Sequence, residues 1–563
     1  MHRDAVVECV PNFSEGRDTK IIEAIAGAIR ASNNVKLLDV DPGADTNRTV
    51  YTFVGSPDAV VEAALAAARA AWEQIDMANH KGAHPRIGAL DVCPFIPVSG
   101  ITMEECADLA RDFGRRLAEG LNVPVYLYEK SATRPERTSL ADIRTGEYEG
   151  LSAKLQDPAW QPDFGPVQFI PRWGATVTGA REFLIAYNVN LNTKDKKLAN
   201  EIALTIREGG RSAKNPDGSI VRDAQGNAIK VPGRLKAVRA IGWYIEEYRC
   251  AQVSINLLDY HQTPLYKVFE VVKEEAEKLG LLVTGSELVG LIPLAAIEEC
   301  GRHFAEKAGK SAGLPEKELV EIAIQSLGLR SVSAFDPEHK IIEWSFKKPS
   351  PLASSRILEF LDELSTDSPA PGGGSAAALS GSLGASLAAM VGNLTVGKKG
   401  YEAGFDELSA MAHKAQQVKA RLAAGIDRDT EAFNAILAAG RMPKATEEQK
   451  KAREQAMERA SREAILVPLD NAKACLEALA CTLTAAKLGN RNSVTDAGTG
   501  ALLAKAGLES ALLNVEINLK SMADSQFTGQ IAAETKALRE QSGQILAEVL
   551  AQVDKCLSWA EKY

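Results

Sequence analysis

The pattern of apolar residues changes near residue 350, and no other feature of the chain constrains its fold as strongly. Before that point, short runs rich in Val, Ile and Leu, such as VKLLDVD and RTVYTFVG, alternate with amphipathic stretches of helical period. After it, the chain is rich in Ala, has few strand-like runs and carries Gly and Pro mostly between long helical stretches. We therefore expect an α+β front half followed by an all-α domain.

The front half repeats one order of elements, β-α-β-β-α-β, and its first copy carries an additional α-β unit. The first copy runs from VVECVPN to a strand at 89–97, and the additional unit ends with the strand VPVYLYE. The second copy begins at FLIAYNVNL and ends at LVTGSELVG. This order is that of the ferredoxin-like plan, so we expect two α/β sandwich subdomains, joined near residues 172–181.

Four parts are predicted along the chain. They are an N-terminal subdomain over 1–180, a second subdomain over 181–345, a linker at 346–353 and a helical domain over 354–563. Residues 211–233 are rich in turn formers and predict an exposed hairpin or mobile excursion, more often a neutral insertion than a functional lid. In the last part we expect eight helices, over 354–365, 374–395, 402–423, 428–440, 446–463, 466–488, 493–523 and 528–558.

Charge and cysteine usage exclude several classes of protein. The formal net charge of −9 and the absence of a long Lys/Arg run argue against nucleic-acid binding. Eight scattered Cys, with no CxxC pair and no Cys/His cluster of zinc spacing, predict reduced thiols, no metal site and a cytoplasmic location. The start of the chain does not resemble a secretion signal. Residues 376–394 come closest to a membrane span, but Gly and Ser dilute them, which favours a packed helix of a soluble protein.

The segment HKGAHPR holds two of the seven histidines, His80 and His84, in a turn before a strand. Histidine exchanges protons near neutral pH, and turns beside a sheet often carry catalytic groups. The Gly and Pro in the segment argue against a helical HxxxH metal site. On spacing alone, a surface or capping role is the more common one.

A second candidate group surrounds the predicted turn at Pro42 and Gly43. Asp41 ends one predicted strand, and Arg48 begins the next. A carboxylate there could orient an imidazole, and a guanidinium could hold a substrate carboxylate with two hydrogen bonds. The same residue types favour turns, and that plainer role is the more common one.

A third group precedes the joint between the subdomains, in the segments DFGP and RWGATVTGAR. Glycines let the backbone approach a flat ligand, and Trp or Phe can offer a stacking face. A domain junction would use the same residue types, so the pattern alone leaves both possibilities open.

Three patterns mark the helical domain. The segment PGGGS at 371–375 opens a helix, where free backbone N–H groups favour an anion or where Ser375 simply caps the helix. Asp427 and Asp429 open another predicted helix, which favours capping and would lower the pKa of Asp429. GNRNSVTD precedes a helix on which two Asn, at 514 and 518, share a face that suits a polar ligand or a partner helix.

Taken together, these segments resemble the formimidoyltransferase-cyclodeaminase family. The transferase part is matched by VECVPNFSEGRD, LLDVDPGADTNRTVYTFVG, HKGAHPRIGALDVCPFIPV, DFGP, WGATVTGAREFLIAYNVNL and GRLKAVRAIGW. The cyclodeaminase part is matched by APGGGSAAAL, IDRDTEAF and GNRNSVTD, shorter strings that single-domain cyclohydrolases share. The excursion at 211–233 departs from the animal members, in which it is shorter.

The resemblance implies roles for individual residues. His84 falls on the catalytic histidine of the transferase, with Asp41 and Arg48 at the same site, and Asp429 falls on the proposed catalytic aspartate of the cyclodeaminase. The implied folate contacts are Asp163, Phe164, Gly165, Pro166, Arg172, Trp173 and Gly174. Further candidates for the cyclodeaminase site are Gly373, Gly374, Ser375, Asn490, Asn492 and Asp496.

The implied activity joins two reactions of histidine degradation and one-carbon metabolism. The formimidoyl group passes from N-formimidoyl-L-glutamate to tetrahydrofolate, and the product closes to 5,10-methenyltetrahydrofolate with release of ammonia. The resemblance also implies polyglutamylated tetrahydrofolate as the carrier, no metal, and a homo-oligomer such as an octamer.

Three alternatives stay open. Only one site is active, for example the transferase alone or a helical domain that acts as a methenyltetrahydrofolate cyclohydrolase; or the donor is formimidoylglycine; or the protein is a non-catalytic folate-binding scaffold. Separate assays of residues 1–345 and 350–563 distinguish the enzyme alternatives. A scaffold would not need His84, Asp41, Arg48 and Asp429 together.

Overall fold

The computed structural model describes residues 5–82, 84–223, 225–346, 350–520, 522 and 524–558. Its contacts divide the chain into two compact units, which we describe separately: Met1–Ile297 with Leu327–Lys347, and Glu298–Ser326 with Lys348–Tyr563. The chain therefore passes from the first unit into the second, returns, and passes again. Of the predicted linker at 346–353, positions 347–349 lie outside the described residues.

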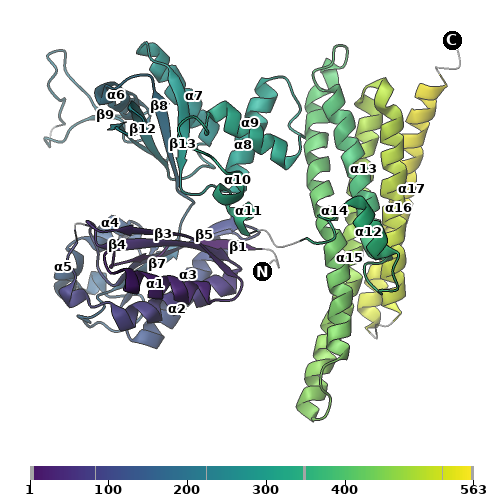
Figure 1. The fold of residues 1–563 in the computed structure, drawn as a ribbon, viewed down its shortest axis with the longest axis horizontal. Helices are drawn as coiled ribbons and strands as arrows, with labels where there is room; N and C mark the ends of the chain where they lie inside the picture. The colour runs from purple at the N-terminus through teal and green to yellow at the C-terminus, as the bar shows by residue number, and fades with distance from the viewer. Residues whose placement is uncertain are drawn as a thin grey trace. The chain divides into compact units, whose positions relative to one another are not determined.

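The first sheet begins with the predicted ferredoxin-like order. Its elements in chain order are β1 (Val6–Cys9), β2 (Asn12–Phe13), α1 (Thr19–Arg30), β3 (Val35–Gly43), β4 (Arg48–Gly55), α2 (Pro57–Gln74), η1 (Met77–Asn79), β5 (Leu90–Ser99), α3 (Met103–Leu121), β6 (Val125–Glu129) and β7 (Thr176–Ala180). Strands β3, β4, β1 and β5 lie side by side and antiparallel, and β7 and β6 extend the sheet in parallel beside β5. Helices α1, α2 and α3 bury the apolar core against this sheet (Figure 1).

Two details of this region differ from the predictions. Pro42 and Gly43 belong to β3 and pair with Thr49 and Arg48, so the turn lies at 44–47 instead. Strand β7 was not predicted, because its sequence TVTGA mixes Thr and Gly and lacks a clear alternation. Since β7 belongs to the first sheet, the joint between the subdomains lies between Ala180 and Ile185, at the end of the expected stretch 172–181.

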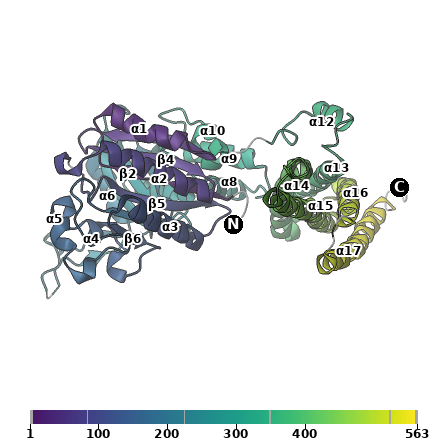
Figure 2. The same cartoon turned by 90° about the horizontal axis from the view of Figure 1, so that it is seen from below.

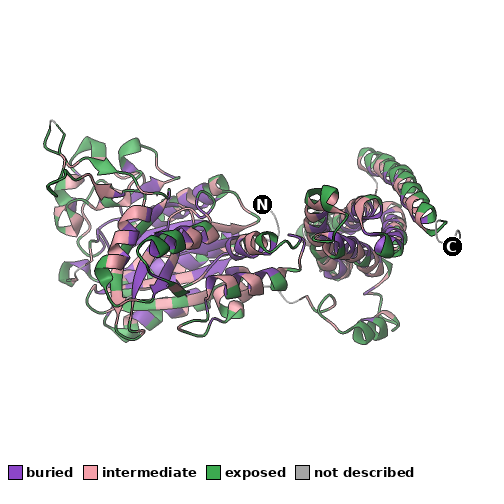
Figure 3. Cartoon of the chain, turned by 90° about the horizontal axis from the view of Figure 1, so that it is seen from above, coloured by how far each residue is buried: buried purple, intermediate pink, exposed green. Residues whose placement is uncertain are grey.

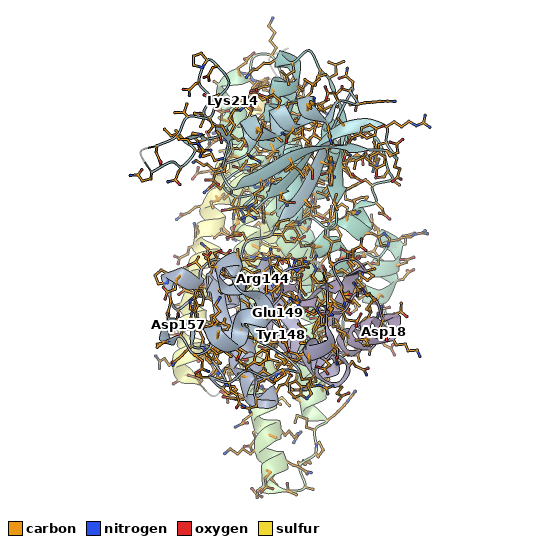
Figure 4. The ribbon with its side chains drawn as sticks, turned by 90° about the vertical axis from the view of Figure 1, so that its left-hand side faces the viewer. Asp18, Arg144, Tyr148, Glu149, Asp157 and Lys214 are labelled. Atoms are coloured by element: carbon orange, nitrogen blue, oxygen red, sulfur yellow. The ribbon has the colours of Figure 1, made fainter. Side chains whose placement is uncertain are left out.

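The opposite face of this sheet is covered in part by what we call the covering segment, residues 134–163. It holds η2 (Pro135–Arg137), α4 (Leu140–Arg144), α5 (Glu147–Lys154) and η3 (Pro158–Trp160). Ile143, Leu151 and Leu155 pack there against Val92 and Tyr126 in a second small core. Figure 4 labels Arg144, Tyr148 and Glu149 on its two α-helices.

The second sheet repeats the ferredoxin-like order without the extension. Its elements are β8 (Ile185–Leu191), α6 (Lys196–Ile206), β11 (Val238–Ile245), β12 (Cys250–Leu257), α7 (Leu265–Lys278) and β13 (Val283–Val289). The strands are antiparallel in the order β11-β12-β8-β13, which confirms the predicted plan. Between α6 and β11, β9 (Arg211–Ser212) pairs with β10 (Lys230–Val231), so the predicted exposed hairpin is confirmed.

The second unit is a bundle of long helices. They are α12 (Ile357–Leu364), α13 (Gly373–Thr395), α14 (Phe405–Gly440), α15 (Glu447–Leu488), α16 (Val494–Leu519) and α17 (Ser525–Leu557), with η4 (Glu402–Gly404) and η5 (Arg491–Ser493) between them. Helix α13 packs against α14, α15 and α16, and Figure 2 shows these helices end-on. In Figure 3 the buried residues follow the strands of the sheets and the inner faces of the bundle.

Two predicted breaks in the bundle are absent, so the expectation of eight helices was wrong. Helices α14 and α15 each run continuously through a position at which we expected an end. A Cβ at Gly425 would lie 2.2 Å from Oδ1 of Asn471, so this glycine permits close packing of α14 on α15. Pro468 is buried inside α15. Glycine and proline serve packing here, and local propensity alone could not reveal it.

Helices α8 (Leu294–Lys307) and α9 (Glu316–Leu327) are joined by a loop that packs on the bundle. The carbonyl of Gly313 accepts hydrogen bonds from Asn393 at 2.9 Å and from Gln416 at 3.0 Å. The backbone N–H of Ala312 donates to Oγ of Ser409 at 2.9 Å. The chain then forms α10 (Pro337–Lys340) and α11 (Ile342–Phe346).

Within the described residues, α13 is the one helix long and apolar enough to cross a membrane. The chain itself buries 61% of its most apolar window. The neighbouring helices α14, α15 and α16 supply this burial, which is the pattern of a core helix in a bundle.

Candidate active sites

The structure brings His84 and Arg48 into direct contact. Nη1 of Arg48 lies 2.7 Å from Nε2 of His84. The turn that carries His84 approaches the β3–β4 turn so closely that a Cβ at Gly82 would lie 2.2 Å from the carbonyl oxygen of Thr46. A guanidinium only donates hydrogen bonds, so Nε2 must accept, and the imidazole proton sits on Nδ1. The contact therefore requires a neutral imidazole.

The charges around His84 favour that neutral form. Burial lowers the pKa of His84, and the positive charges of Arg48 and Arg144 lower it further. The negative charge of Asp91 acts in the opposite direction. The ring therefore stays neutral, and able to accept a proton, even at a pH somewhat below the ordinary imidazole pKa of about 6.5. This is the property that a general base at neutral pH requires.

Asp91 is a member of this site that the sequence did not reveal. Its side chain is only 1% exposed; it accepts a hydrogen bond from the N–H of Ile87 at 2.8 Å and forms an ion pair with Arg144. It thus holds the turn after His84 and the end of α4 in place. A carboxylate inside the apolar run ALDVCPF was the available signal, since a buried charge needs a partner.

Asp41 lies on β3 opposite Val50 and is exposed. Among the described residues, the structure gives its carboxylate no hydrogen bond to His84. Its negative charge raises the pKa of Arg48, although burial and Arg144 lower that pKa overall. A direct role for Asp41 at the imidazole stays a prediction, and Asp91 is the carboxylate whose charge acts on both His84 and Arg48.

His80, the other histidine of the turn, stabilises the fold through hydrogen bonds at both ring nitrogens. Its Nε2 lies 2.8 Å from the carbonyl oxygen of Asn47, and its Nδ1 accepts from Nε of Arg86 at 3.3 Å. Arg86 is itself paired with Glu149 at 2.7 Å and Glu147 at 3.1 Å, on α5 of the covering segment. Both ring nitrogens of His80 are therefore occupied, and of the two histidines only His84 keeps a nitrogen without a partner among the described residues.

Trp173 and Gly174, from the expected folate-contacting segment, lie beside the turn of His84. The N–H of Ala89 donates to the carbonyl of Trp173 at 2.8 Å, and a Cβ at Gly174 would lie 2.1 Å from the carbonyl of Ile87. Gly174 has a φ of +78°, which favours glycine. The indole of Trp173 is fully buried and donates to Thr176 at 3.0 Å, so it offers no open face for stacking.

Of the other members of that segment, Asp163 and Phe164 lie beside β6, and Arg172 lies at the end of α2. Asp163 accepts from the N–H of Leu127 at 2.9 Å and pairs with Arg137 at 2.8 Å, and Phe164 pairs with Val125. Gly165 has a φ of +85°, and Pro166 is half-buried. Arg172 is exposed and donates to the carbonyls of Trp72 and Glu73, both at 2.9 Å. These polar groups serve the fold, and a role of this segment in folate contact stays a prediction.

A cleft of about 520 Å³ lies near the far end of β4. Glu8, Asp39, Arg181, His339 and Lys340 are among its lining residues. Burial raises the pKa of Glu8 to about 8, which the charge of Arg181 partly opposes. Since Thr52 on β4 is among its lining residues, the cleft begins roughly 13 Å along the strand from Arg48 at about 3.3 Å per residue. No sequence pattern predicted this cleft.

In the bundle, Asp429 is enclosed by the start of α13. Ser375 lies with its Oγ 3.3 Å from Oδ2 of Asp429, and a Cβ at Gly374 would lie 2.1 Å from Oδ1. A Cβ at Gly373 would lie 3.4 Å from Nδ2 of Asn514. Burial raises the pKa of Asp429, and hydrogen bonds from Ser375 partly oppose this shift. The structure thus brings these predicted residues together around a protonatable carboxyl group.

Three local predictions for this site were wrong. Asp429 lies inside the continuous helix α14 and not in its first turn, so the groups that lower its pKa belong to Ser375 at the start of α13 and not to the N-terminus of its own helix. Asp427 is not a cap; it accepts from the N–H groups of Leu352 at 3.0 Å and Ala353 at 3.1 Å. Ser375 is not a cap either, since α13 begins at Gly373 and Ser375 donates to the carbonyl of Ile426 at 2.9 Å.

The other cyclodeaminase candidates lie at the opposite end of α13. Asn490 is buried, and its N–H donates to Oγ1 of Thr395, the last residue of α13, at 2.9 Å. Asn492 is exposed, and Asp496 lies half-buried in the first turn of α16. At 1.5 Å per residue, the two ends of this 23-residue helix are roughly 33 Å apart. Within one chain, these residues are therefore too far from Asp429 to join its site. A motif in the sequence does not show at which end of a bundle its residues lie.

Three family models match the chain. "Formiminotransferase domain, N-terminal subdomain" matches residues 6–181, "Formiminotransferase domain" matches 186–347, and "Formiminotransferase-cyclodeaminase" matches 356–537.

Curated proteins are similar along the whole chain or along one part of it. Formimidoyltransferase-cyclodeaminase of Rattus norvegicus is 44% identical over 552 residues, which cover 98% of this chain and 99% of the relative. Glutamate formimidoyltransferase of Thermoplasma acidophilum is 42% identical over 311 residues, 55% of this chain and 95% of the relative. Methenyltetrahydrofolate cyclohydrolase of Methylorubrum extorquens is 39% identical over 193 residues, 34% of this chain and 93% of the relative.

Proposed function

The chain belongs to the formimidoyltransferase-cyclodeaminase family, and on that premise we propose that it is a folate enzyme with two active sites. It transfers the formimidoyl group of N-formimidoyl-L-glutamate to tetrahydrofolate. It then converts 5-formimidoyltetrahydrofolate to 5,10-methenyltetrahydrofolate and ammonia. The observation that carries the first activity is the neutral imidazole of His84 held against Arg48.

In the transfer step, N5 of tetrahydrofolate attacks the amidine carbon of the donor. A bond from N5 to that carbon forms, and N5 loses its proton to Nε2 of His84, which becomes free to accept when Arg48 turns to a carboxylate of the donor. The bond from the carbon to the glutamate nitrogen then breaks, and the imidazolium returns a proton to that nitrogen. One histidine thus acts as base and then as acid, and Arg48 beside it suits a carboxylate of the donor.

In the second step, N10 of the folate attacks the same carbon and closes a five-membered ring. The bond from that carbon to the imino nitrogen breaks, and this nitrogen leaves as ammonia with the proton of N10 and one further proton. The reaction is intramolecular, so the reacting atoms are already close. The leaving ammonia needs a proton, and the carboxyl group of Asp429 is suited to deliver it because burial favours its protonated form. Ser375 holds that carboxyl group in place.

The finer parts of the proposal concern the setting of the enzyme. We place it in histidine degradation, in the cytoplasm, as a homo-oligomer such as an octamer, with polyglutamylated tetrahydrofolate as its carrier and no metal. Eight free thiols support a reducing compartment. Exposed Leu383, Leu502 and Leu513 on α13 and α16 support self-association of the bundle.

A second candidate function applies to the helical part alone. Its similarity to a methenyltetrahydrofolate cyclohydrolase favours opening of the methenyl ring by water in place of deamination. The two functions differ in whether ammonia is produced from 5-formimidoyltetrahydrofolate.

One spectroscopic experiment tests the proposal. Protein, N-formimidoyl-L-glutamate and tetrahydrofolate are mixed, and methenyltetrahydrofolate absorbance and ammonia are recorded together. We expect equal amounts of both. If neither 5-formimidoyltetrahydrofolate nor methenyltetrahydrofolate with ammonia forms, the transferase assignment is overturned. Accumulation of 5-formimidoyltetrahydrofolate without ammonia would overturn the cyclodeaminase assignment.

A further inference from the structure

A second guanidinium, that of Arg144, is linked through Asp91 to the turn that carries His84. Arg144 is the last residue of α4, and its side chain is 16% exposed. It pairs through Nη2 with Asp91, whose carboxylate also accepts from the N–H of Ile87 in the turn of His84. Arg48 contacts His84 directly, and Asp91 ties Arg144 to the turn that carries His84, so the three side chains belong to one site.

The hydrogen bonds of this site are incomplete. Nε of Arg48, Nδ1 of His84 and Nε of Arg144 are buried and have no hydrogen-bond partner among the described residues. Buried donors without partners are rare in folded proteins and call for an acceptor. Three of them in one place, on residues from three different elements, indicate a ligand rich in acceptor oxygens.

The charge balance of the site points to the same kind of ligand. The site holds two guanidiniums, those of Arg48 and Arg144, and its one buried carboxylate, Asp91, pairs with Arg144. Asp41 is exposed and lies on the neighbouring strand. An anionic ligand would restore the balance, and carboxylates match the donor geometry of a guanidinium.

We propose that Arg144 binds the side-chain carboxylate of the donor amino acid, so that the enzyme selects a dicarboxylate, and that Asp91 is its positioning residue. This inference rests on the proposed transferase function. The α-carboxylate of the donor is next to the nitrogen that reacts at His84, which assigns it to Arg48. The second carboxylate lies farther from the reacting atoms and falls to Arg144 on the covering segment.

The test compares two donors, N-formimidoyl-L-glutamate and N-formimidoyl-L-glutamine, which differ only in the side-chain charge. In the wild type, kcat/KM for the glutamate donor should exceed that for the glutamine donor roughly 10- to 100-fold, the range for one charge-assisted hydrogen bond. In Arg144→Gln this preference should disappear, through a raised KM for the glutamate donor, while the glutamine donor is little affected. Arg115→Gln, which removes an exposed arginine on α3, should keep the preference.

The inference is overturned if Arg144→Gln keeps the preference, or if it loses activity equally on both donors. Arg144→Lys keeps the cation and takes the place of the Gln variant if that variant does not fold. An equal loss on both donors in Arg144→Lys also overturns the inference. A circular dichroism spectrum and a melting temperature like those of the wild type report that each variant is folded. A wild type that transfers from neither donor overturns the proposed transferase instead.

A pH profile separates Asp91 from a merely structural residue. Arg48, Arg144 and Asp91 are the charged groups that act on His84. Removal of the positive charge in Arg144→Gln raises the pKa of His84, so the acidic limb of kcat/KM moves to higher pH. Removal of the negative charge in Asp91→Asn moves it to lower pH. Shifts in the same direction, or no shift in a folded Asp91→Asn variant, would overturn the positioning role.

Discussion

The side chain of His84 shows how a single hydrogen bond can define a chemical state. Because Arg48 only donates, their contact at 2.7 Å fixes both the charge and the tautomer of the imidazole. Substrate binding can then use Nδ1, which has no partner among the described residues. The reactive histidine is thus distinguished from His80, whose two nitrogens are occupied.

His84→Ala should reduce the transfer rate by roughly 10²–10⁴-fold, because positioned acid–base catalysis contributes about that factor. The rate is measured with saturating donor and tetrahydrofolate. Ring closure of supplied 5-formimidoyltetrahydrofolate serves as the control and should be unchanged. A variant that transfers near the wild-type rate would show that another group moves the proton.

Asp429→Asn should abolish ammonia release and spare transfer, since an amide cannot deliver the proton. The raised pKa of Asp429 has a further consequence for stability. Its protonated form stabilises the fold at low pH, and this contribution is lost as the pH rises through the folded-state pKa. At neutral pH, where the amide mimics the protonated acid, the melting temperature of the variant should equal or exceed that of the wild type. Unchanged ammonia release, or a lower melting temperature, would contradict this assignment.

The residues of the sites were predictable to different degrees. His84, Arg48 and Asp429 were named from motifs, because such strings carry side chains of matching chemistry at fixed spacing. Asp91 and Arg144 were missed, because their pairing joins β5 to a short helix 53 residues later in the chain. Trp173 was predicted to offer a stacking face but fills the core, since an aromatic residue near glycines suits either role.

At the scale of elements, glycines determine how closely α13 and α16 approach. A Cβ at Gly507 would lie 2.7 Å from the carbonyl of Ala377 and 2.8 Å from the N–H of Gly381, both on the backbone of α13. Backbone atoms cannot rotate away as a side chain can. This contact therefore depends on the missing side chain.

Gly507→Ala should destabilise the bundle by about 1–3 kcal/mol, the usual cost of overpacking, which outweighs the gain of about 0.5–1 kcal/mol in helix propensity. Gly543→Ala on α17 is the matched control, because a Cβ there meets nothing within 4 Å. That variant should be more stable by about 0.5–1 kcal/mol. Chemical denaturation measures both. The explanation fails if the two variants shift stability in the same direction.

Element order was predictable, and element limits were less so. The two β-α-β-β-α-β orders follow from periodicity and turn residues, which act locally. Strand β7 was missed because its neighbours β5 and β6 stabilise it, and the continuity of α14 and α15 was missed because their packing tolerates Gly425 and Pro468. Tertiary contacts decide these points, and no local pattern contains them.

At the scale of the whole molecule, the helical unit includes a segment from the front half of the chain. Residues 298–326 belong to it, and three hydrogen bonds at Ala312 and Gly313 attach them to α13 and α14. A cut at the predicted linker would therefore divide a compact unit.

A fragment of residues 298–563 should be more stable than a fragment of residues 350–563. Three hydrogen bonds at about 1 kcal/mol each, with a shift of about 2–4 °C per kcal/mol, give a melting temperature higher by at least about 5 °C. Scanning calorimetry of both fragments measures the difference. Equal melting temperatures would mean that the segment adds no stability to the bundle.

Residues 1–345 should retain the transferase activity, and an assay of that fragment checks this.

The path of the chain between the two units also matters during synthesis on the ribosome. The hydrogen bonds of Gly313 can form only after Asn393, 80 residues later, and Gln416, 103 residues later, have been synthesised. At about 5–20 residues per second, the loop between α8 and α9 stays without its native partners for roughly 4–20 s. In a nascent chain, the loop around Gly313 is thus exposed after the transferase half has emerged. We expect a chaperone to act on this loop.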